Sequence, residues 1–303
     1  MRTEKEIYDL VLNFAFQDER IRIVTLEGSR TNVNIPKDNL QDYDITFFVI
    51  DMGEFLKSDD WLSVFGNRIM MQKPEDMELF PPEEKGFSYI MLFDDGVKID
   101  LTLLPVSMLE EYLTRDKLVK IMLDKDNMIK TEIVPTDEDY YIKCPTERKF
   151  DDCCNEFWNV ATYVSKGLLR GEILFAIDHM NEVLRHELLR MISWYVGTEK
   201  GFNFSLGKNY KFLDKHISKE LWDNLLNTYS MSSYEEMWKS FDLCLCLFKK
   251  ISKKVADSLG YNYPDYDENV TKYLETQKRI SNKYLYKPFW VLSVPDSIRH
   301  LQA

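Results

Sequence analysis

The chain places a Gly-Ser pair at the end of one apolar run and an Asp-Tyr-Asp triplet at the start of the next. The first run covers residues 21–26, the pair is Gly28-Ser29, and the triplet is Asp42-Tyr43-Asp44. Glycine permits a sharp turn where a strand ends. Side chains alternate faces along a strand, so Asp42 and Asp44 are expected to project two carboxylates from one face. The pattern predicts a site for metal ions and a nucleotide.

The residue types suit this chemistry. Mg²⁺ is usually held by one or two carboxylates together with substrate phosphates and water, not by a cage of protein ligands. Ser29 and the backbone N–H groups that follow Gly28 are expected to bond a triphosphate, and the guanidinium of Arg30 suits phosphate oxygens. The turn and the acid pair are therefore predicted to act together.

A third acid lies in a predicted β-hairpin. The apolar runs 87–93 and 97–104 are separated by Asp94-Asp95-Gly96, and an Asp-Gly pair between two such runs is a strong hairpin signal. Asp100 stands between Ile99 and Leu101 in the second run. A charge there is costly to bury unless it is paired or coordinated to a metal, so Asp100 is a candidate third ligand.

The order Gly-Ser, Asp-x-Asp and a distant strand Asp resembles the nucleotidyltransferase superfamily that includes DNA polymerase β. The strings Leu-Glu-Gly-Ser-Arg-Thr-Asn at 26–32, Gln-Asp-Tyr-Asp-Ile at 41–45 and Val-Lys-Ile-Asp-Leu-Thr at 97–102 are similar to those of the aminoglycoside 6-adenylyltransferases, which modify streptomycin. The resemblance extends along nearly the whole chain in length and in the helical character of the second half.

The resemblance implies Mg-dependent transfer of AMP from ATP to the 6-hydroxyl of streptomycin, with release of pyrophosphate and resistance to the antibiotic. It implies two Mg²⁺ ions held by Asp42 and Asp44, with Asp100 either completing the metal shell or accepting the hydroxyl proton. It also implies a lysine of the second half on the triphosphate, for which Lys208 is the first choice.

The expected fold is α+β. A polymerase-β-like nucleotidyltransferase domain with a mixed sheet is predicted over residues 1–145, followed by an α-helical bundle that binds the aminoglycoside over 146–303. The first half is expected to contain helices near 4–17 and 106–114 and strands near 21–27, 44–50, 87–93 and 97–104. The aromatic C-terminal tail, from residue 282 on, is expected to dock on the body or on a second subunit.

Helical spacing in the second half suggests where the drug binds. Asp178, Glu182 and Arg185 fall at i, i+4 and i+7, which would place them on one polar helix face. The resemblance favours Asp178 and Glu182 as contacts to a cationic sugar, and the alternative is a solvated face with an internal Glu–Arg pair. Trp158 is expected to pack on a sugar ring, and the alternative is a core position.

Composition limits the partners. The formal net charge of −12, from 51 acidic and 39 basic residues, argues against a nonspecific nucleic-acid binder and suits a cationic ligand. No apolar run approaches the length that spans a bilayer, and the five cysteines form no Cys-x-x-Cys pair. A cytoplasmic protein with no membrane partner is therefore expected, and its oligomeric state is left open.

Two alternatives share the same catalytic strings. One is a nucleotidyltransferase of this core that acts on a protein hydroxyl or an RNA 3′ end. The other is a noncatalytic nucleotide-binding module, against which the presence of all three carboxylates argues.

Overall fold

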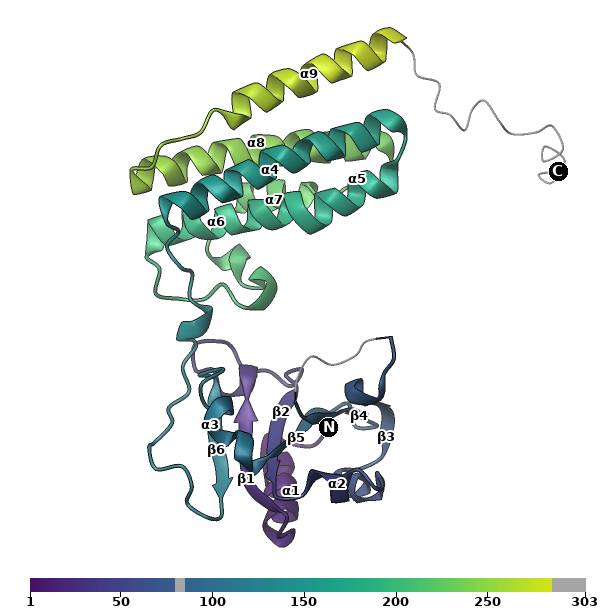
Figure 1. Ribbon diagram of the computed structural model, residues 1–303, viewed down its shortest axis with the longest axis vertical. Coiled ribbons are helices and arrows are strands. Elements are labelled where there is room, and N and C mark those ends of the chain that lie inside the picture. The colour runs from purple at the N-terminus through teal and green to yellow at the C-terminus, as the bar shows by residue number, and fades with distance from the viewer. Residues whose placement is uncertain (80–84, 285–303) are drawn as a thin grey trace, which may run out of the picture. The chain divides into compact units, whose positions relative to one another are not determined.

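The computed structural model describes residues 1–79 and 85–284, and the chain divides into two compact units, Met1–Asp139 and Tyr140–Ala303 (Figure 1). The first unit is built on a six-stranded sheet with the order β3-β4-β5-β2-β1-β6. Its strands are β1 (Ile21–Glu27), β2 (Tyr43–Val49), β3 (Arg68–Gln72), β4 (Phe87–Phe93), β5 (Lys98–Pro105) and β6 (Val119–Asp124), and its helices are α1 (Glu4–Gln17), α2 (Met52–Phe55) and α3 (Leu109–Tyr112).

The sheet is mixed. β2 and β5 run parallel, and the other neighbouring strands are antiparallel. The β4–β5 pair confirms the predicted hairpin. Sequence reading missed both edge strands, β3 and β6, because short edge strands depend on a neighbour for their hydrogen bonds. The helix expected over 106–114 is shorter than predicted, since a 3₁₀ turn over Val106–Met108 leads into the four-residue α3.

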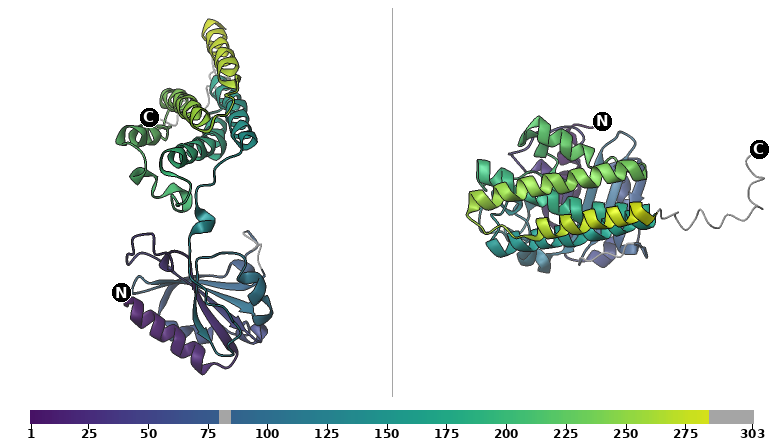
Figure 2. Two further views of the ribbon diagram at one scale, coloured as in Figure 1. Left: turned by 90° about the vertical axis from the view of Figure 1, so that its left-hand side faces the viewer. Right: turned by 90° about the horizontal axis from the view of Figure 1, so that it is seen from above.

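Local sequence explains the position of α1. Thr3 and Glu6 form a capping box at its first turn. Ile7, Val11 and Ala15 then follow at intervals of four residues and are all buried. These side chains pack with apolar residues of the sheet. The left view of Figure 2 shows α1 lying along one face of the sheet, so this helix covers that face.

The opposite face of the sheet is divided. At one end Ile23, Phe48 and Leu104 pack with Leu109 and Tyr112 of the α3 segment. At the other end the same face carries charged side chains that are only partly buried: Glu27, Asp44, Lys98 and Asp100. The short α3 covers the apolar end, so the polar end is available to a ligand.

The second unit is helical, which confirms the predicted α+β class. Its helices are α4 (Glu147–Arg170), α5 (Ile173–His179), a π-helical segment (Met180–Leu184), α6 (Arg185–Lys200), α7 (Lys219–Asn227), α8 (Tyr234–Leu259) and α9 (Tyr266–Tyr284). The Thr146 side chain caps α4 by accepting a hydrogen bond from the Lys149 N–H, and Gly171 ends that helix in the left-handed conformation. Within the described residues, none of the helices combines the length and apolar character needed to cross a bilayer.

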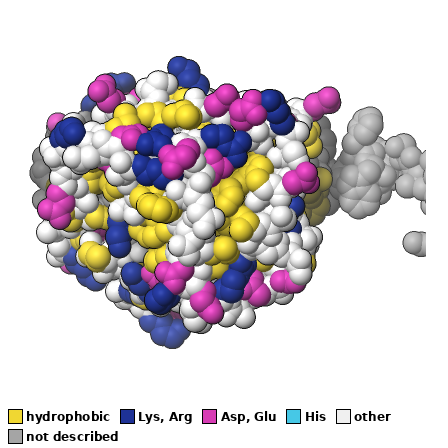
Figure 3. Space-filling view, turned by 90° about the horizontal axis from the view of Figure 1, so that it is seen from below, with side chains coloured by type: hydrophobic (Ala, Val, Ile, Leu, Met, Phe, Trp, Pro, Cys, Tyr) yellow, Lys and Arg dark blue, Asp and Glu magenta, His cyan; other side chains and the backbone are white. Residues whose placement is uncertain are grey.

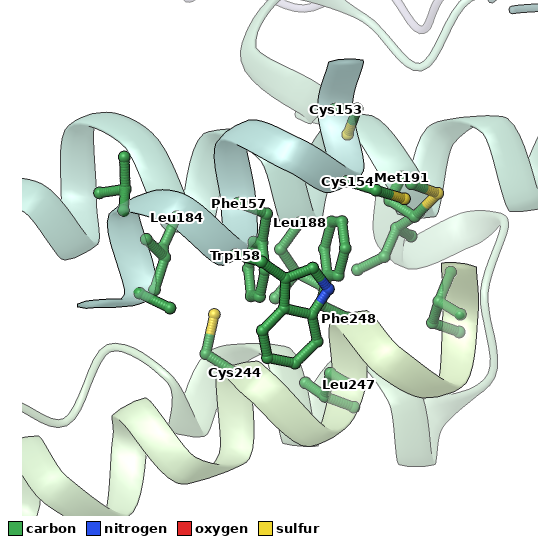
Figure 4. Packing of buried hydrophobic residues seen from close by; sticks show 14 of the residues in the cluster. Cys153, Cys154, Phe157, Trp158, Leu184, Leu188, Met191, Cys244, Leu247 and Phe248 are labelled. Atoms are coloured by element: carbon green, nitrogen blue, oxygen red, sulfur yellow. The ribbon is translucent and has the colours of Figure 1, made fainter. Parts of the chain in front are cut away.

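Trp158 lies in the core of this unit and not at its surface. Its side chain is 2 % exposed and makes edge contacts with Phe157 and Phe248, whose own rings stack 3.7 Å apart (Figure 4). The expectation that Trp158 packs on a sugar ring is therefore wrong, and the core alternative holds. An aromatic residue at helical spacing gives no sign of which face it occupies until the neighbouring helices are placed.

We expect Trp158→Ala to lower the free energy of unfolding by about 3–5 kcal/mol, because it removes a buried indole and leaves a cavity between α4 and α8. Trp158→Phe keeps most of the ring contacts and is expected to cost less than half as much. Urea denaturation followed by circular dichroism measures both variants. A loss below about 1 kcal/mol for the alanine variant would contradict this packing role.

On the face of the first unit seen in Figure 3, Lys and Arg side chains are interspersed with Asp and Glu, and hydrophobic groups lie between them. A nucleic-acid binder typically presents a continuous basic stripe, which this face does not. The C-terminal tail was predicted from residue 282 on; residues 282–284 form the end of α9, and residues 285–303, on which its docking depends, lie outside the described part of the chain.

Candidate active site

Gly28 ends β1 at the polar end of the sheet. Its φ of +66° belongs to the left-handed region, and its N–H donates to the Leu118 carbonyl at 3.0 Å. A Cβ at this position would lie 2.6 Å from Oδ2 of Asp44. Glycine is therefore required for two reasons: the turn needs a left-handed backbone conformation, and a side chain would collide with the Asp44 carboxylate. Ser29 follows, partly buried, in the 3₁₀ turn Gly28–Arg30, and its contact with a triphosphate stays a prediction.

The strand register brings the acids together. Asp44 on β2 is paired with Asp100 on the parallel strand β5, and on its other side with Glu27 on β1. Three neighbouring strands thus present a carboxylate at the same level of the sheet, about 4.8 Å apart from strand to strand. Asp42 comes directly before β2, two residues from Asp44, and its charge is one of those that act on Asp44.

Lys98 is a site residue that sequence reasoning missed. Its Nζ lies 2.8 Å from Oδ2 of Asp42 and 2.8 Å from Oδ2 of Asp100. The signal was present in the sequence, because Lys98 and Asp100 are two residues apart on one strand and so share a face. Burial lowers the pKa of Lys98, but its hydrogen bonds to Asp100 and Asp42 and their charges outweigh burial and raise it overall.

Glu27 is the second residue that was missed. Its Oε1 accepts hydrogen bonds from Oγ1 of Thr46 at 2.5 Å and from Oγ1 of Thr25 at 3.2 Å. The Thr25 hydroxyl is in turn 2.7 Å from the Tyr112 hydroxyl on α3. This network fixes Glu27 beside Asp44. Its position before the Gly-Ser pair hinted at a role, but only the pairing of β1 with β2 places it next to the acids.

The carboxylates of the cluster repel one another when no metal ion is bound. Burial, followed by the charges of Asp100, Glu27 and Asp42, raises the pKa of Asp44 to about 6, and Lys98 offsets this only in part. Oδ1 of Asp100 is buried and has no hydrogen-bond partner within the described protein. Such an oxygen is costly to bury and is typical of a position that a bound ion or ligand completes.

These residues fit a magnesium ion in their chemistry. The oxygens of Asp42, Asp44 and Asp100 are the hard ligands that Mg²⁺ prefers, and the buried oxygen of Asp100 lacks a partner. Among the residues with described positions, no three His, Cys, Asp or Glu side chains already form a metal cage.

Arg30 does not have the role expected from the sequence. It is 7 % exposed, donates to the backbone carbonyls of Asp42 at 3.0 Å and Gln41 at 2.6 Å, and lies over the Tyr43 ring at 3.6 Å. Its donors hold the segment that carries Asp42, so Arg30 positions an acid instead of binding phosphate. A buried arginine and a phosphate ligand look alike in sequence, because both sit beside a glycine turn.

The polar face expected in the helical unit is interrupted. Asp178 and Glu182 are exposed, but Arg185 is 2 % exposed, donates to the Thr228 carbonyl and stacks 3.7 Å from the Tyr229 ring. The π-helical segment Met180–Leu184 inserts an i→i+5 turn, which rotates the residues after it relative to an α-helix. The alternative of a solvated face with an internal Glu182–Arg185 pair is therefore wrong, while drug contacts by Asp178 and Glu182 stay a prediction.

A cleft of about 430 Å³ opens elsewhere in the helical unit. Asp152, Glu156, Glu187 and Trp194 line it together with basic residues, and Glu187 pairs with Arg190 at 3.0 Å. Sequence reasoning missed this cleft because its residues come from α4 and α6, which are distant along the chain.

Lys208, the expected triphosphate ligand, is exposed in the short turn Lys208–Tyr210, and its role stays a prediction.

The raised pKa of Asp44 makes the stability of the metal-free protein depend on pH. The folded protein binds this proton up to about pH 6, whereas the ordinary pKa is 3.8, so stability falls as the pH rises between the two values. In EDTA, Asp44→Asn is expected to raise the free energy of unfolding by about 1–2 kcal/mol at pH 7.5 and to leave it nearly unchanged at pH 4.

Urea denaturation at both pH values measures this effect, with Asp257→Asn, an exposed position on α8, as the control. Equal destabilisation of the Asp44 variant at both pH values would contradict the electrostatic account.

Comparison with known proteins gives the family. The sequence matches the family described as Streptomycin adenylyltransferase over residues 1–277. It is 62 % identical over 279 residues to an aminoglycoside 6-adenylyltransferase of Campylobacter jejuni, covering 92 % of this chain and 97 % of that one. It is 59 % identical over 277 residues to the protein of that name from Bacillus subtilis (strain 168), covering 91 % and 98 %.

A solved structure is also similar. The crystal structure of an aminoglycoside 6-adenyltransferase from Bacillus subtilis is 53 % identical in sequence, with a TM-score of 0.47, over 92 % of this chain and 99 % of that one. The family match includes the Gly-Ser turn, the three aspartates and the helical unit up to residue 277, and on this ground the chain belongs to the streptomycin adenylyltransferase family.

Proposed function

We propose that this protein transfers AMP from ATP to the 6-hydroxyl of streptomycin, with Mg²⁺ as the metal. The observation that carries the proposal is the meeting of Asp42, Asp44 and Asp100 beside the Gly28 turn, on a sheet face that α3 covers at its other end. The relatives named aminoglycoside 6-adenylyltransferase support an aminoglycoside as the acceptor, and the family description supports streptomycin.

In the proposed reaction the acceptor oxygen attacks the α-phosphorus of ATP. A bond forms between that oxygen and the α-phosphorus. The bond between the α-phosphorus and the oxygen that bridges it to the β-phosphate breaks, and pyrophosphate leaves. Asp42, Asp44 and Asp100 would hold Mg²⁺, which supplies positive charge to the triphosphate and the leaving oxygens when bound. The hydroxyl proton passes to a carboxylate of the cluster, for which Asp100 is our candidate. Glu27, held by two threonine hydroxyls, stands beside Asp44 and adds to the negative charge that attracts the metal.

We assign residues 1–145 to the nucleotide and residues 146–303, which make up nearly all of the helical unit, to the drug. The net charge of −12 favours a cationic acceptor, because an acidic protein attracts it and carboxylates bind it by charge-assisted hydrogen bonds. Within the helical unit, the cleft beside Trp194 and Glu156 suits a drug better than the exposed pair Asp178 and Glu182, since ligand sites are concave and combine apolar walls with a few polar groups.

The cleft and the exposed pair Asp178 and Glu182 are alternative binding surfaces for the drug, and substitutions in them are expected to have different effects. Glu156→Gln is expected to raise the KM for streptomycin at least about tenfold with a smaller change in kcat, because it removes a charge-assisted contact. Asp178→Asn serves as the matched variant and is expected to change the KM less than threefold. Steady-state kinetics measures both, and the reverse order would assign the drug to the α5 face.

Mass spectrometry tests the proposed activity. The purified protein is incubated with Mg-ATP and streptomycin, with gentamicin, kanamycin and spectinomycin in parallel, and Asp100→Asn serves as the inactive control. We expect an AMP-sized mass gain on streptomycin alone. No gain on any drug, with ATP still bound, would contradict the proposal and direct the search to protein or RNA acceptors. ATP binding without turnover on any acceptor would indicate a noncatalytic module.

A further inference from the structure

Lys98 occupies the space between two of the candidate metal ligands. Its ammonium bridges Oδ2 of Asp42 and Oδ2 of Asp100, at 2.8 Å from each. The bridge follows from the sheet, because β2 and β5 run parallel with Tyr43 opposite Ile99, which sets Asp42 beside Lys98. A cation is thus already present at the carboxylates that are expected to receive a metal.

The acidic cluster depends on this lysine. Among the residues that the structure describes, the ion pairs of Asp42 and Asp100 are both with Lys98. Arg30, which lies nearby, donates to the backbone carbonyl of Asp42 and not to its carboxylate. Two neighbouring carboxylates without a counter-ion repel each other, so a cation at this point stabilises the metal-free protein.

Lys98 has room to move. Its side chain is 33 % exposed, and it lines a cavity of about 150 Å³ together with Gln41, Asp42 and Tyr43. A lysine carries its charge on a flexible four-carbon stem, so its ammonium can leave the two oxygens without displacement of β5.

We propose that Lys98 is a built-in counter-ion, which holds Asp42 and Asp100 in the metal-free enzyme, competes with the divalent cation for their oxygens, and moves off them when the metal–nucleotide complex binds. The inference rests on the metal site of the proposed function. Lys98 thus positions two carboxylates. It also couples metal binding to nucleotide binding, because the negative charge of the triphosphate gives the ammonium a new partner. The metal therefore binds more readily together with the nucleotide than alone.

Metal titration without nucleotide or drug tests this. Mn²⁺ is titrated by calorimetry into the full-length wild type and into Lys98→Met, which keeps most of the length of the side chain but removes its charge. We expect Mn²⁺ to bind Lys98→Met about tenfold more tightly, because the competing cation is gone. Lys98→Arg keeps the charge and is expected to retain the weak affinity of the wild type. Lys120→Met, which removes a charge from the edge strand β6, is the control and is expected to change nothing.

A second readout separates this role from a purely structural one. In EDTA, Lys98→Met is expected to melt at a lower temperature than the wild type, and Mn²⁺ is expected to raise its melting temperature more than that of the wild type. Unchanged or weaker Mn²⁺ binding by Lys98→Met would overturn the inference. Failure of streptomycin adenylylation would leave these results valid, whereas absence of Mn²⁺ binding to both proteins would contradict the metal site and the inference together.

Discussion

Asp44→Asn and Asp100→Asn are each expected to lower kcat/KM for AMP transfer at least about a thousandfold, while the protein stays folded. Asparagine keeps the size of the side chain but removes the charge that would hold the metal between neighbouring strands. Asp44 lies in register with Asp100 and Glu27, so no other side chain on β2 can take its place. Asp42→Asn is expected to follow the same pattern.

The Asp44 variant should combine a loss of activity with a gain of stability, as is typical of charged active-site residues that destabilise the fold. Its activity is expected to be lost, yet its metal-free stability at neutral pH is expected to rise, because the charge with the raised pKa is removed. Radiolabelled AMP transfer and urea denaturation on the same preparations measure the two effects. Asp257→Asn, exposed on α8, is the control for both. Activity within about tenfold of the wild type in either aspartate variant would remove that residue from the mechanism.

Gly28→Ala is expected to lower kcat/KM at least about a hundredfold, since the added methyl group would displace the Asp44 carboxylate against which the glycine backbone lies. The Cβ would meet Oδ2 of Asp44 at 2.6 Å, so either the turn or the carboxylate must shift. The backbone conformation adds a further cost of about 1 kcal/mol in stability.

Gly260→Ala is a matched control for the backbone cost. Gly260 has a φ of +70°, against +66° for Gly28, but a Cβ at Gly260 would meet nothing within 4 Å. Gly260→Ala should therefore lose only the backbone cost in urea, Gly28→Ala should lose at least as much, and only Gly28→Ala should lose activity. Equal activity in both would show that the close approach of Gly28 to Asp44 has no catalytic importance.

The candidate metal ligands could be predicted because the relevant information is local. The alternation of side chains along a strand places Asp42 and Asp44 together, and the Asp-Gly pair identifies the hairpin that carries Asp100. Glycine at position 28 could be predicted as a turn. That its missing side chain also makes room for Asp44 could not, because the two residues meet only when β1 pairs with β2.

The predictions that were wrong failed because they concern contacts between residues distant in the chain. Arg30 was expected to bind phosphate and Trp158 to pack on a sugar ring, from their chemical type, and Arg185 was expected on a polar helix face, from its spacing. All three are buried. Whether a tryptophan or an arginine is exposed depends on which helix or loop packs over it. For Arg185 the cause is specific, since the π-helical segment before it changes the helical register, which the spacing of residues does not reveal.

The sequence by itself determined the α+β class, the family, the Gly-Ser turn and the three aspartates, because each of these depends on residues close together in the chain or on strings of residues matched between proteins. Only the tertiary structure decided that Lys98 bridges Asp42 and Asp100 and that Glu27 stands beside Asp44. The contact of Lys98 with Asp42 and the position of Glu27 beside Asp44 each join different segments of the chain, and their geometry is fixed by the order and register of the sheet.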